Sequence, residues 1–212
     1  TIGGVQSATD AGTYQATFTP KEGYKWGDDT TEAKTVNWTI GRANVATPSQ
    51  SGSLTYTGNA QTPTWANYDS SKVTIGGTTS GTNAGNYNAT FTPKANYQFS
   101  DGTTGAKTVV WTIAKAAGSL TLNKTSLTLG AASSTTGTIT ATRAGDGAIT
   151  ATSSNTGIAT VKVSGTTITV TAVASGTATI TVKCAAGTNH TAPANKTVSV
   201  TVEMASPDPV SY

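Results

Sequence analysis

The feature that most constrains this chain is an internal repeat with a period of about 73 residues. Residues 1–40 align without a gap to residues 74–113, and roughly two thirds of the aligned positions are identical. That identity is far greater than a threonine-rich composition would produce by chance, so the repeat is real. One complete repeat therefore spans residues 41–113, and residues 1–40 are the C-terminal half of an earlier copy.

Half of a repeat is an unfavourable folding unit on its own. A half sandwich exposes the face that should form its core, together with an unpaired strand edge. We therefore expect the chain to be a piece of a longer protein, in which about 33 further residues complete the first copy. The alternative is that a strand from another molecule completes it.

The residue pattern predicts strands throughout the chain. Segments such as 167–170 and 179–182 alternate Thr with Ile or Val, which is the period-2 signature of a half-buried strand. Gly, Ser, Asn and Thr interrupt every candidate helical stripe, and no apolar run approaches the roughly 18 residues of a membrane span. We expect an all-β fold of tandem sandwiches, arranged end to end because the junctions between repeats are short.

The composition excludes several classes of function. The chain has one Cys, Cys184, and one His, His190, so it can form neither a Cys/His zinc cluster nor an internal disulfide. Its 13 Lys and Arg residues are scattered and do not form the basic stripe that nucleic acid requires. We expect no catalysis, no metal, no cofactor, no nucleic-acid partner and no membrane insertion.

Comparison of the two copies separates core residues from surface residues. Aromatic and turn residues are retained at the 73-residue offset, whereas most charged residues differ. Two retained turns, 10–14 and 83–87, each lead into a strand through a Tyr, at Tyr14 and Tyr87. They resemble the tyrosine corner of immunoglobulin-like sandwiches, although Ala stands where those sandwiches have a core Cys. With the segment 56–64, they make residues 1–113 similar to the MBG-type repeats of bacterial surface proteins.

Residues 114–203 do not follow the repeat. They contain, in order, the segments SLTLNKTSLTL at 119–129, SSN at 153–155, IATV at 158–161 and ASGTATITV at 174–182. This order resembles the bacterial immunoglobulin-like group 2 domain of intimin- and invasin-type adhesins, other surface proteins and phage virion proteins. Thr152 stands where that family usually has a Trp. The resemblance implies a sandwich of about seven strands.

A few side chains are candidates for ligand contact. Spacing of two residues would place Tyr24 and Trp26 on one face of a strand, and their counterparts are Tyr97 and Phe99. Core packing is the expected role of these aromatics, and sugar stacking is the alternative. The residues for which glycan contact is considered are Tyr24, Trp26, Trp65, Tyr68 and Tyr97.

The remaining polar groups have simple structural explanations. Asp28 and Asp29 are expected to form a polar turn, with a calcium site as the alternative. Lys34 and Lys107 are expected to be solvated, with an isopeptide crosslink as the alternative. We expect Cys184 to be a small buried apolar residue and His190 to lie on the surface.

These observations predict a non-catalytic, extracellular structural or adhesive module that serves as a spacer or stalk in a bacterial cell-surface protein. Its expected partners are glycans or proteins at the cell surface. One alternative is an accessory part of a phage head or tail that contacts other virion subunits, and another is a carbohydrate-binding module of a secreted enzyme. The predicted parts are a half repeat at 1–40, a complete repeat at 41–113, a group 2 sandwich at 114–203 and a tail or linker at 204–212.

Overall fold

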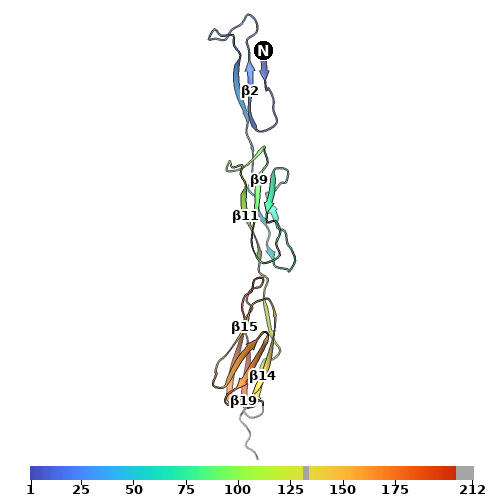
Figure 1. The fold of residues 1–212 in the computed structure, drawn as a ribbon, viewed down its shortest axis with the longest axis vertical. Helices are drawn as coiled ribbons and strands as arrows, with labels where there is room; N and C mark the ends of the chain where they lie inside the picture. The colour runs from blue at the N-terminus through green and yellow to red at the C-terminus, as the bar shows by residue number, and fades with distance from the viewer. Residues whose placement is uncertain (131–133, 204–212) are drawn as a thin grey trace, which may run out of the picture. The chain divides into compact units, whose positions relative to one another are not determined.

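A computed structural model describes residues 1–130 and 134–203. The described residues form strands β1 to β19 connected by turns and loops, without a helix (Figure 1). The fold is therefore all-β, and no helix in the described ranges could cross a membrane. The predicted tail, 204–212, lies outside the described residues.

The chain divides into two compact units. The first unit comprises residues 1–53, 61–81 and 86–111, and the second comprises residues 54–60, 82–85 and the chain from 112 onward. The division assigns two short loops of the complete repeat, 54–60 and 82–85, to the same unit as the C-terminal sandwich.

The half repeat forms one antiparallel sheet in the order β1–β2–β3. Its central strand pairs along its whole length with β3, from Gly12 opposite Ile40 to Phe18 opposite Lys34. The strands are β1 (Ile2–Gly4), β2 (Gly12–Phe18) and β3 (Lys34–Ile40).

The complete repeat contains the corresponding strands in a larger sheet of order β6–β11–β9–β8, together with two short strand pairs. One pair, β5–β7, is antiparallel, and the other, β4–β10, is parallel. The strands are β4 (Ala43–Val45), β5 (Ser49–Ser51), β6 (Leu54–Thr55), β7 (Thr64–Ala66), β8 (Val73–Gly77), β9 (Gly85–Pro93), β10 (Tyr97–Phe99) and β11 (Lys107–Ala114).

The two copies share the same aromatic geometry. Tyr14 stacks on Trp38 with ring centroids 4.8 Å apart, and Tyr87 stacks on Trp111 at 4.5 Å. Each Trp also donates its indole N–H to a backbone carbonyl, Trp38 at 2.9 Å and Trp111 at 2.7 Å. These contacts satisfy the only polar group of each indole, so the ring can serve as core.

The copies differ in what covers this aromatic face. In the complete repeat, Trp65 packs edge-on against Phe91 at a centroid distance of 4.8 Å, and Phe91 and Trp111 are fully buried. The matching residues of the half repeat, Phe18 and Trp38, are only half-buried. The sheet of the half repeat therefore presents an apolar face that the complete repeat buries.

The same difference corrects one expectation. Tyr24 and Trp26 were expected to share a strand, but they lie in a loop, whereas their counterparts form β10. Strand β10 exists because it pairs with β4, residues 43–45. The described half repeat contains no strand equivalent to β4, so residues 24–26 have no edge to pair with.

The second unit holds a sandwich of two four-stranded sheets, with orders β12–β14–β17–β16 and β13–β19–β18–β15 (Figure 1). Inward-facing Ile, Val, Leu and Ala side chains from both sheets form one core. The strands are β12 (Ser119–Leu122), β13 (Ser126–Gly130), β14 (Thr136–Ala144), β15 (Ile149–Ser153), β16 (Ala159–Ser164), β17 (Thr167–Ala172), β18 (Gly176–Cys184) and β19 (Lys196–Glu203).

This sandwich has eight strands in its described residues, where the sequence predicted about seven. The difference arises because residues 119–130 form two strands that belong to different sheets. Asn123 ends the first strand, since its backbone N–H donates to Thr140 O at 3.0 Å and its Oδ1 accepts from Thr140 N at 2.8 Å. The chain then crosses to the other sheet at Ser126.

Two equivalent turns are closed by an aspartate. In the second copy, Asp101 accepts from the backbone N–H of Thr103 at 3.1 Å and from its hydroxyl at 2.7 Å, while Lys107 Nζ lies 2.5 Å from the other carboxylate oxygen. The first copy repeats this arrangement with Asp28, Thr30 and Lys34. Hydrogen bonds from the lysine and the threonine hold the pKa of both carboxyl groups well below the ordinary value of 3.8.

These turns give the first unit an acid-sensitive contribution to stability. Because the folded-state pKa of Asp101 is lowered, the unfolded chain binds more protons near pH 3.8, so stability rises with pH there. The contribution is complete above about pH 5 and is lost as the pH falls through the folded-state pKa. We expect ¹³C NMR titration of the carboxyl groups to show both Asp28 and Asp101 titrating below the ordinary range.

The variant Lys107→Gln is the matched control, because it removes the ion pair of one copy only. Its expected effect is to raise the pKa of Asp101 toward 3.8 while the titration of Asp28 stays unchanged. An unchanged Asp101 titration in this variant would contradict the assigned cause.

Candidate functional site

The five aromatic residues considered for glycan contact are not gathered on one exposed surface. Trp65 and Tyr68 both pack against buried Phe91, with ring centroids 4.8 and 5.6 Å from it. Tyr97 is half-buried on β10. The structure thus uses Trp65 and Tyr68 to cover the core of the complete repeat.

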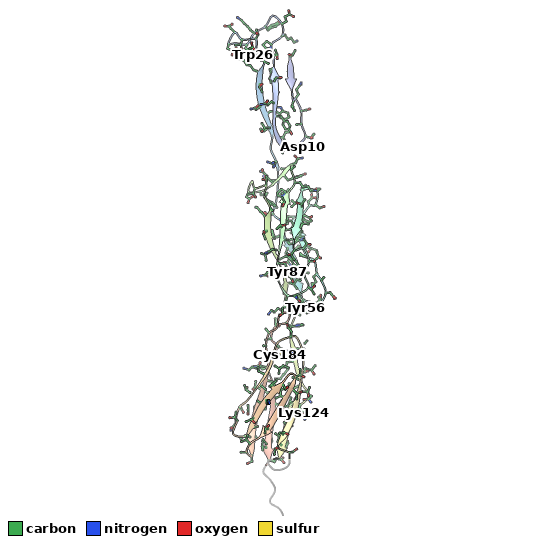
Figure 2. The ribbon with its side chains drawn as sticks, in the orientation of Figure 1. Asp10, Trp26, Tyr56, Tyr87, Lys124 and Cys184 are labelled. Atoms are coloured by element: carbon green, nitrogen blue, oxygen red, sulfur yellow. The ribbon has the colours of Figure 1, made fainter. Side chains whose placement is uncertain are left out.

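The two aromatics of the half repeat differ in exposure. Tyr24 is 72% exposed, whereas Trp26 is half-buried and donates its indole N–H to Glu32 O at 2.8 Å. Lys34 Nζ lies 5.3 Å from the centre of the Trp26 ring. Trp26 is thereby fixed within its own loop, at the opposite end of the half-repeat sheet from Asp10 (Figure 2).

The turn before β2 is closed by Tyr14, whose hydroxyl donates to Asp10 O at 2.7 Å. In the second copy, Tyr87 covers Gly81 so closely that a Cβ there would lie 2.4 Å from the ring. Tyr87 is labelled in Figure 2. A larger residue at position 81 would require this ring to shift. In the first copy Ala8 stands at the matching position, and Tyr14 still stacks on Trp38.

A recess of the complete repeat lies beside Tyr68. It has a volume of about 350 Å³, and its wall includes the side chains of Asn44, Asp69 and Lys72. The neighbouring residue, Asn67, adopts a left-handed backbone conformation with a φ of 61°. Amide, carboxylate, ammonium and aromatic groups are thus placed around one shallow depression.

The electrostatics of this recess are set by Asp69. Its carboxylate accepts from Ser71 N at 2.9 Å and from Ser71 Oγ at 2.6 Å, and Lys72 Nζ lies 3.0 Å away. These hydrogen bonds, that of Ser71 first, lower the pKa of Asp69 to about 2. At neutral pH the recess therefore carries a fixed carboxylate and a neighbouring ammonium group.

The aspartates considered for calcium are committed to other contacts. Asp28 is bonded to Thr30 and Lys34, and Asp29 forms an ion pair with Lys25. No group of three or more potential metal ligands occurs within residues 1–130 and 134–203. An ammonium group against the carboxylate occupies the place that a cation would take.

The lysines considered for a crosslink have the wrong surroundings for it. Lys107 contacts Asp101, whose side chain is 54% exposed, and its Nζ lies 4.6 Å from the Phe99 ring centre. A charged pair in contact with water is an ordinary ion pair. Lys34 and Lys107 are therefore neither freely solvated nor placed in a buried reaction site.

The single Cys and the single His of the chain lie in the second unit. Cys184 is 4% exposed at the end of β18, so the expectation that it is buried is confirmed. His190 was expected on the surface, but its side chain is only 23% exposed and packs edge-on against Tyr56 at 5.4 Å. Tyr56 and His190 are far apart in the chain, so residue periodicity could not predict this contact.

Two asparagines that the sequence did not single out hold turns through their side chains, Asn96 in the first unit and Asn189 in the second. The copy comparison missed Asn96 because Gly23 stands at the matching position. Asn189 was missed because residues 114–203 have no second copy in the chain. The only sequence signal for them is a polar loop residue directly before an aromatic ring.

The chain was compared with curated proteins, solved structures and protein families. No curated protein matches the sequence. Crystal structures of the S-layer protein SbsC are similar: domains 4 and 5 at 16% identity and a TM-score of 0.35, covering 76% of this chain and 99% of that one. The longer fragment, rSbsC(31-844), has 14% identity and a TM-score of 0.40 over 97% of this chain and 35% of that one.

A third solved structure is a Bacteroides ovatus mixed-linkage glucan utilization locus protein, SGBP-B, in complex with a mixed-linkage heptasaccharide. It has 14% identity and a TM-score of 0.17, covering 92% of this chain and 54% of that one. At the level of sequence families, residues 116–195 match the bacterial Ig-like domain (group 2). Within the C-terminal sandwich, residues 116–195 are thus similar in sequence to that family.

Proposed function

We propose that this chain is a non-catalytic structural or adhesive module, a spacer or stalk segment of a bacterial cell-surface protein. The immunoglobulin-like fold and the group 2 match of residues 116–195 support a surface module. The observation that carries the proposal is the parallel pairing of the first and last strands of the C-terminal sheet, β13 and β19.

Parallel pairing determines how a sandwich responds to tension. Ser126 pairs with Ser199 and Gly130 with Glu203, so five consecutive residue pairs connect β13 to β19. Once β12 has separated from β14, force on the chain pulls the start of β13 and the end of β19 in opposite directions along the strand axis. The strands must then slide past each other, and all of their hydrogen bonds are loaded together.

The complete repeat has the same kind of connection at both of its ends. Near its start, residues 43–45 of β4 pair in parallel with β10. Near its end, Ile113 and Ala114 of β11 pair in parallel with Leu54 and Thr55 of β6. The first strand of the repeat, β4, and its last strand, β11, are thus each held by parallel pairing to another strand of the repeat.

The domain boundaries are part of this proposal. The chain comprises the second half of a repeat at 1–40, a complete repeat at 41–113 and a group 2 sandwich at 114–203. Two observations support them: the shared Tyr–Trp geometry of the repeats, and the uncovered apolar face of residues 1–40.

A second function, glycan adhesion, is favoured by the recess beside Tyr68. Proteins recognise sugars through an aromatic surface together with convergent hydrogen-bonding side chains. The recess offers the Tyr68 ring, the Asn44 amide and the Asp69 carboxylate around about 350 Å³. A surface module with this recess would bind glycans in addition to acting as a spacer.

Pulling direction provides the direct test of the spacer function. Single-molecule force spectroscopy can load the group 2 sandwich through positions 125 and 203, which directly precede β13 and end β19 and therefore shear these two strands against each other. Loading through Thr160 and Val173 instead peels β16 from β17 at the open end of their hairpin. Both attachments use introduced Cys residues in a Cys184→Ala background. The expected unfolding force is severalfold higher in shear, because bonds that break together resist more than bonds that break in turn. Equal forces in the two directions would contradict the mechanical role.

Glycan binding is tested with a soluble oligosaccharide array followed by titration calorimetry on any hit. Binding is expected to weaken at least about tenfold in Asn44→Ala and in Asp69→Asn, since each removes a hydrogen bond to a charged or amide partner. Tyr24→Ala is the control, because Tyr24 is exposed in a separate loop and should leave binding unchanged. Absence of any glycan binding by the parent chain would contradict the adhesive function. It would not affect the test of the spacer function.

A further inference from the structure

The same side-chain contact occurs twice in this molecule, once in each compact unit. In the first unit, Asn96 Oδ1 accepts the backbone N–H of Ala11 at 2.8 Å, and Asn96 Nδ2 donates to Asp10 Oδ1 at 2.7 Å. One carboxamide therefore bonds to two consecutive residues of the turn that precedes β2.

The second unit repeats this contact atom for atom. Asn189 Oδ1 accepts the backbone N–H of Ala84 at 2.8 Å, and Asn189 Nδ2 donates to Asn83 Oδ1 at 3.2 Å. Residues 83–84 occupy the positions of residues 10–11 in the repeat. The turn that receives the carboxamide is thus the same repeat element in both cases.

The surrounding backbone contacts correspond as well. Ala43 N–H donates to Asn96 O at 2.9 Å, and Ala116 N–H, at the matching repeat position, donates to Asn189 O at 2.9 Å. The preceding basic residue also reaches the asparagine loop: Arg42 donates to Ala95 O at 3.0 Å. Lys115 likewise donates to Gly187 O at 2.6 Å.

The loops that supply the asparagines belong to different domains and differ in the residues before the Asn. One reads KANY at 94–97 and belongs to the complete repeat, and the other reads GTNH at 187–190 and belongs to the group 2 sandwich. Both loops place the Asn directly before an aromatic ring, and both present the same side chain to the same turn.

We propose that the turn Asx-Ala-Gly, at 10–12 and 83–85, is a docking site for a carboxamide side chain carried by the domain that follows it in the chain. The chemistry is complementary. The turn presents one donor, the Ala N–H, beside one acceptor, the Asx Oδ1, and a carboxamide presents one acceptor beside two donors. The site therefore accepts any following domain that places an Asn on this loop.

Complementarity makes the two sites respond differently to the change from Asn to Asp. A carboxylate at position 96 could still accept the Ala11 N–H through one oxygen, but its other oxygen would face Asp10 Oδ1, so two acceptors of like charge would meet without a donor. A carboxylate at position 189 would face the Asn83 amide, which can rotate to donate through its own Nδ2. Asn96→Asp should thus disrupt its site, and Asn189→Asp should be tolerated.

The test is amide hydrogen exchange of Ala11 and Ala84, measured by NMR on the whole chain. Asn96→Ala and Asn96→Asp are each expected to accelerate exchange at Ala11 by at least about tenfold and to leave Ala84 unchanged. Asn189→Ala should accelerate exchange at Ala84 only, and Asn189→Asp should keep Ala84 protected. Asn88→Ala, at an exposed position on β9, is the matched control and should change neither amide.

The double variant Asp10→Asn, Asn96→Asp exchanges donor and acceptor across the first site and is expected to restore protection of Ala11. Recovery distinguishes carboxamide recognition from a general structural role of Asn96, which the double variant would not repair. Unchanged Ala11 exchange in Asn96→Ala, or no recovery in the double variant, would overturn the proposal. The second site tests it independently, since accelerated Ala84 exchange in Asn189→Asp would also overturn it.

Discussion

The constraint on which this structure depends is that each sheet has one apolar face, and that face must be covered by a second layer. In the complete repeat the cover is supplied by residues 41–72, whose Trp65 and Tyr68 rest on Phe91. In the group 2 sandwich two four-stranded sheets cover each other. In the half repeat the sheet forms with the same pairing and the same Tyr–Trp stack, but Phe18 and Trp38 remain partly exposed. Local sequence therefore specifies the sheet, and a separate segment supplies its burial.

Much of this architecture could be predicted from the sequence. Alternating Thr and Ile or Val marked strands such as β17 and β18, and the repeat identified residues that should behave alike in both copies. The prediction failed at residues 24–26, because whether a short segment becomes a strand depends on a partner far away in the chain. It also failed at His190, whose burial depends on residues 54–60. Both failures concern contacts between distant segments, about which residue periodicity carries no information.

The candidate site was less predictable than the fold. Core packing was the expected role of the few aromatic residues, and Trp65 and Tyr68 do pack against Phe91, but no sequence pattern indicated the polar recess beside Tyr68. The turn contacts of Asn96 and Asn189 could not be predicted, since an isolated polar loop residue has no distinctive sequence pattern. Their importance emerges only when the atoms on both sides of each contact are compared. Together with the parallel strand pairs, these contacts describe a chain whose polar chemistry is used to hold its own parts in place.

Native-state hydrogen exchange measures the effect of the covering layer directly, because β2 and β9 have nearly the same sequence and the same antiparallel pairing on at least one side. The account predicts that the amides of β9 exchange only through large-scale unfolding, whereas those of β2 exchange orders of magnitude faster through local opening of the uncovered sheet. Equal protection of the two strands would contradict the claim that burial by a second layer, rather than the sheet itself, provides the stability of each repeat.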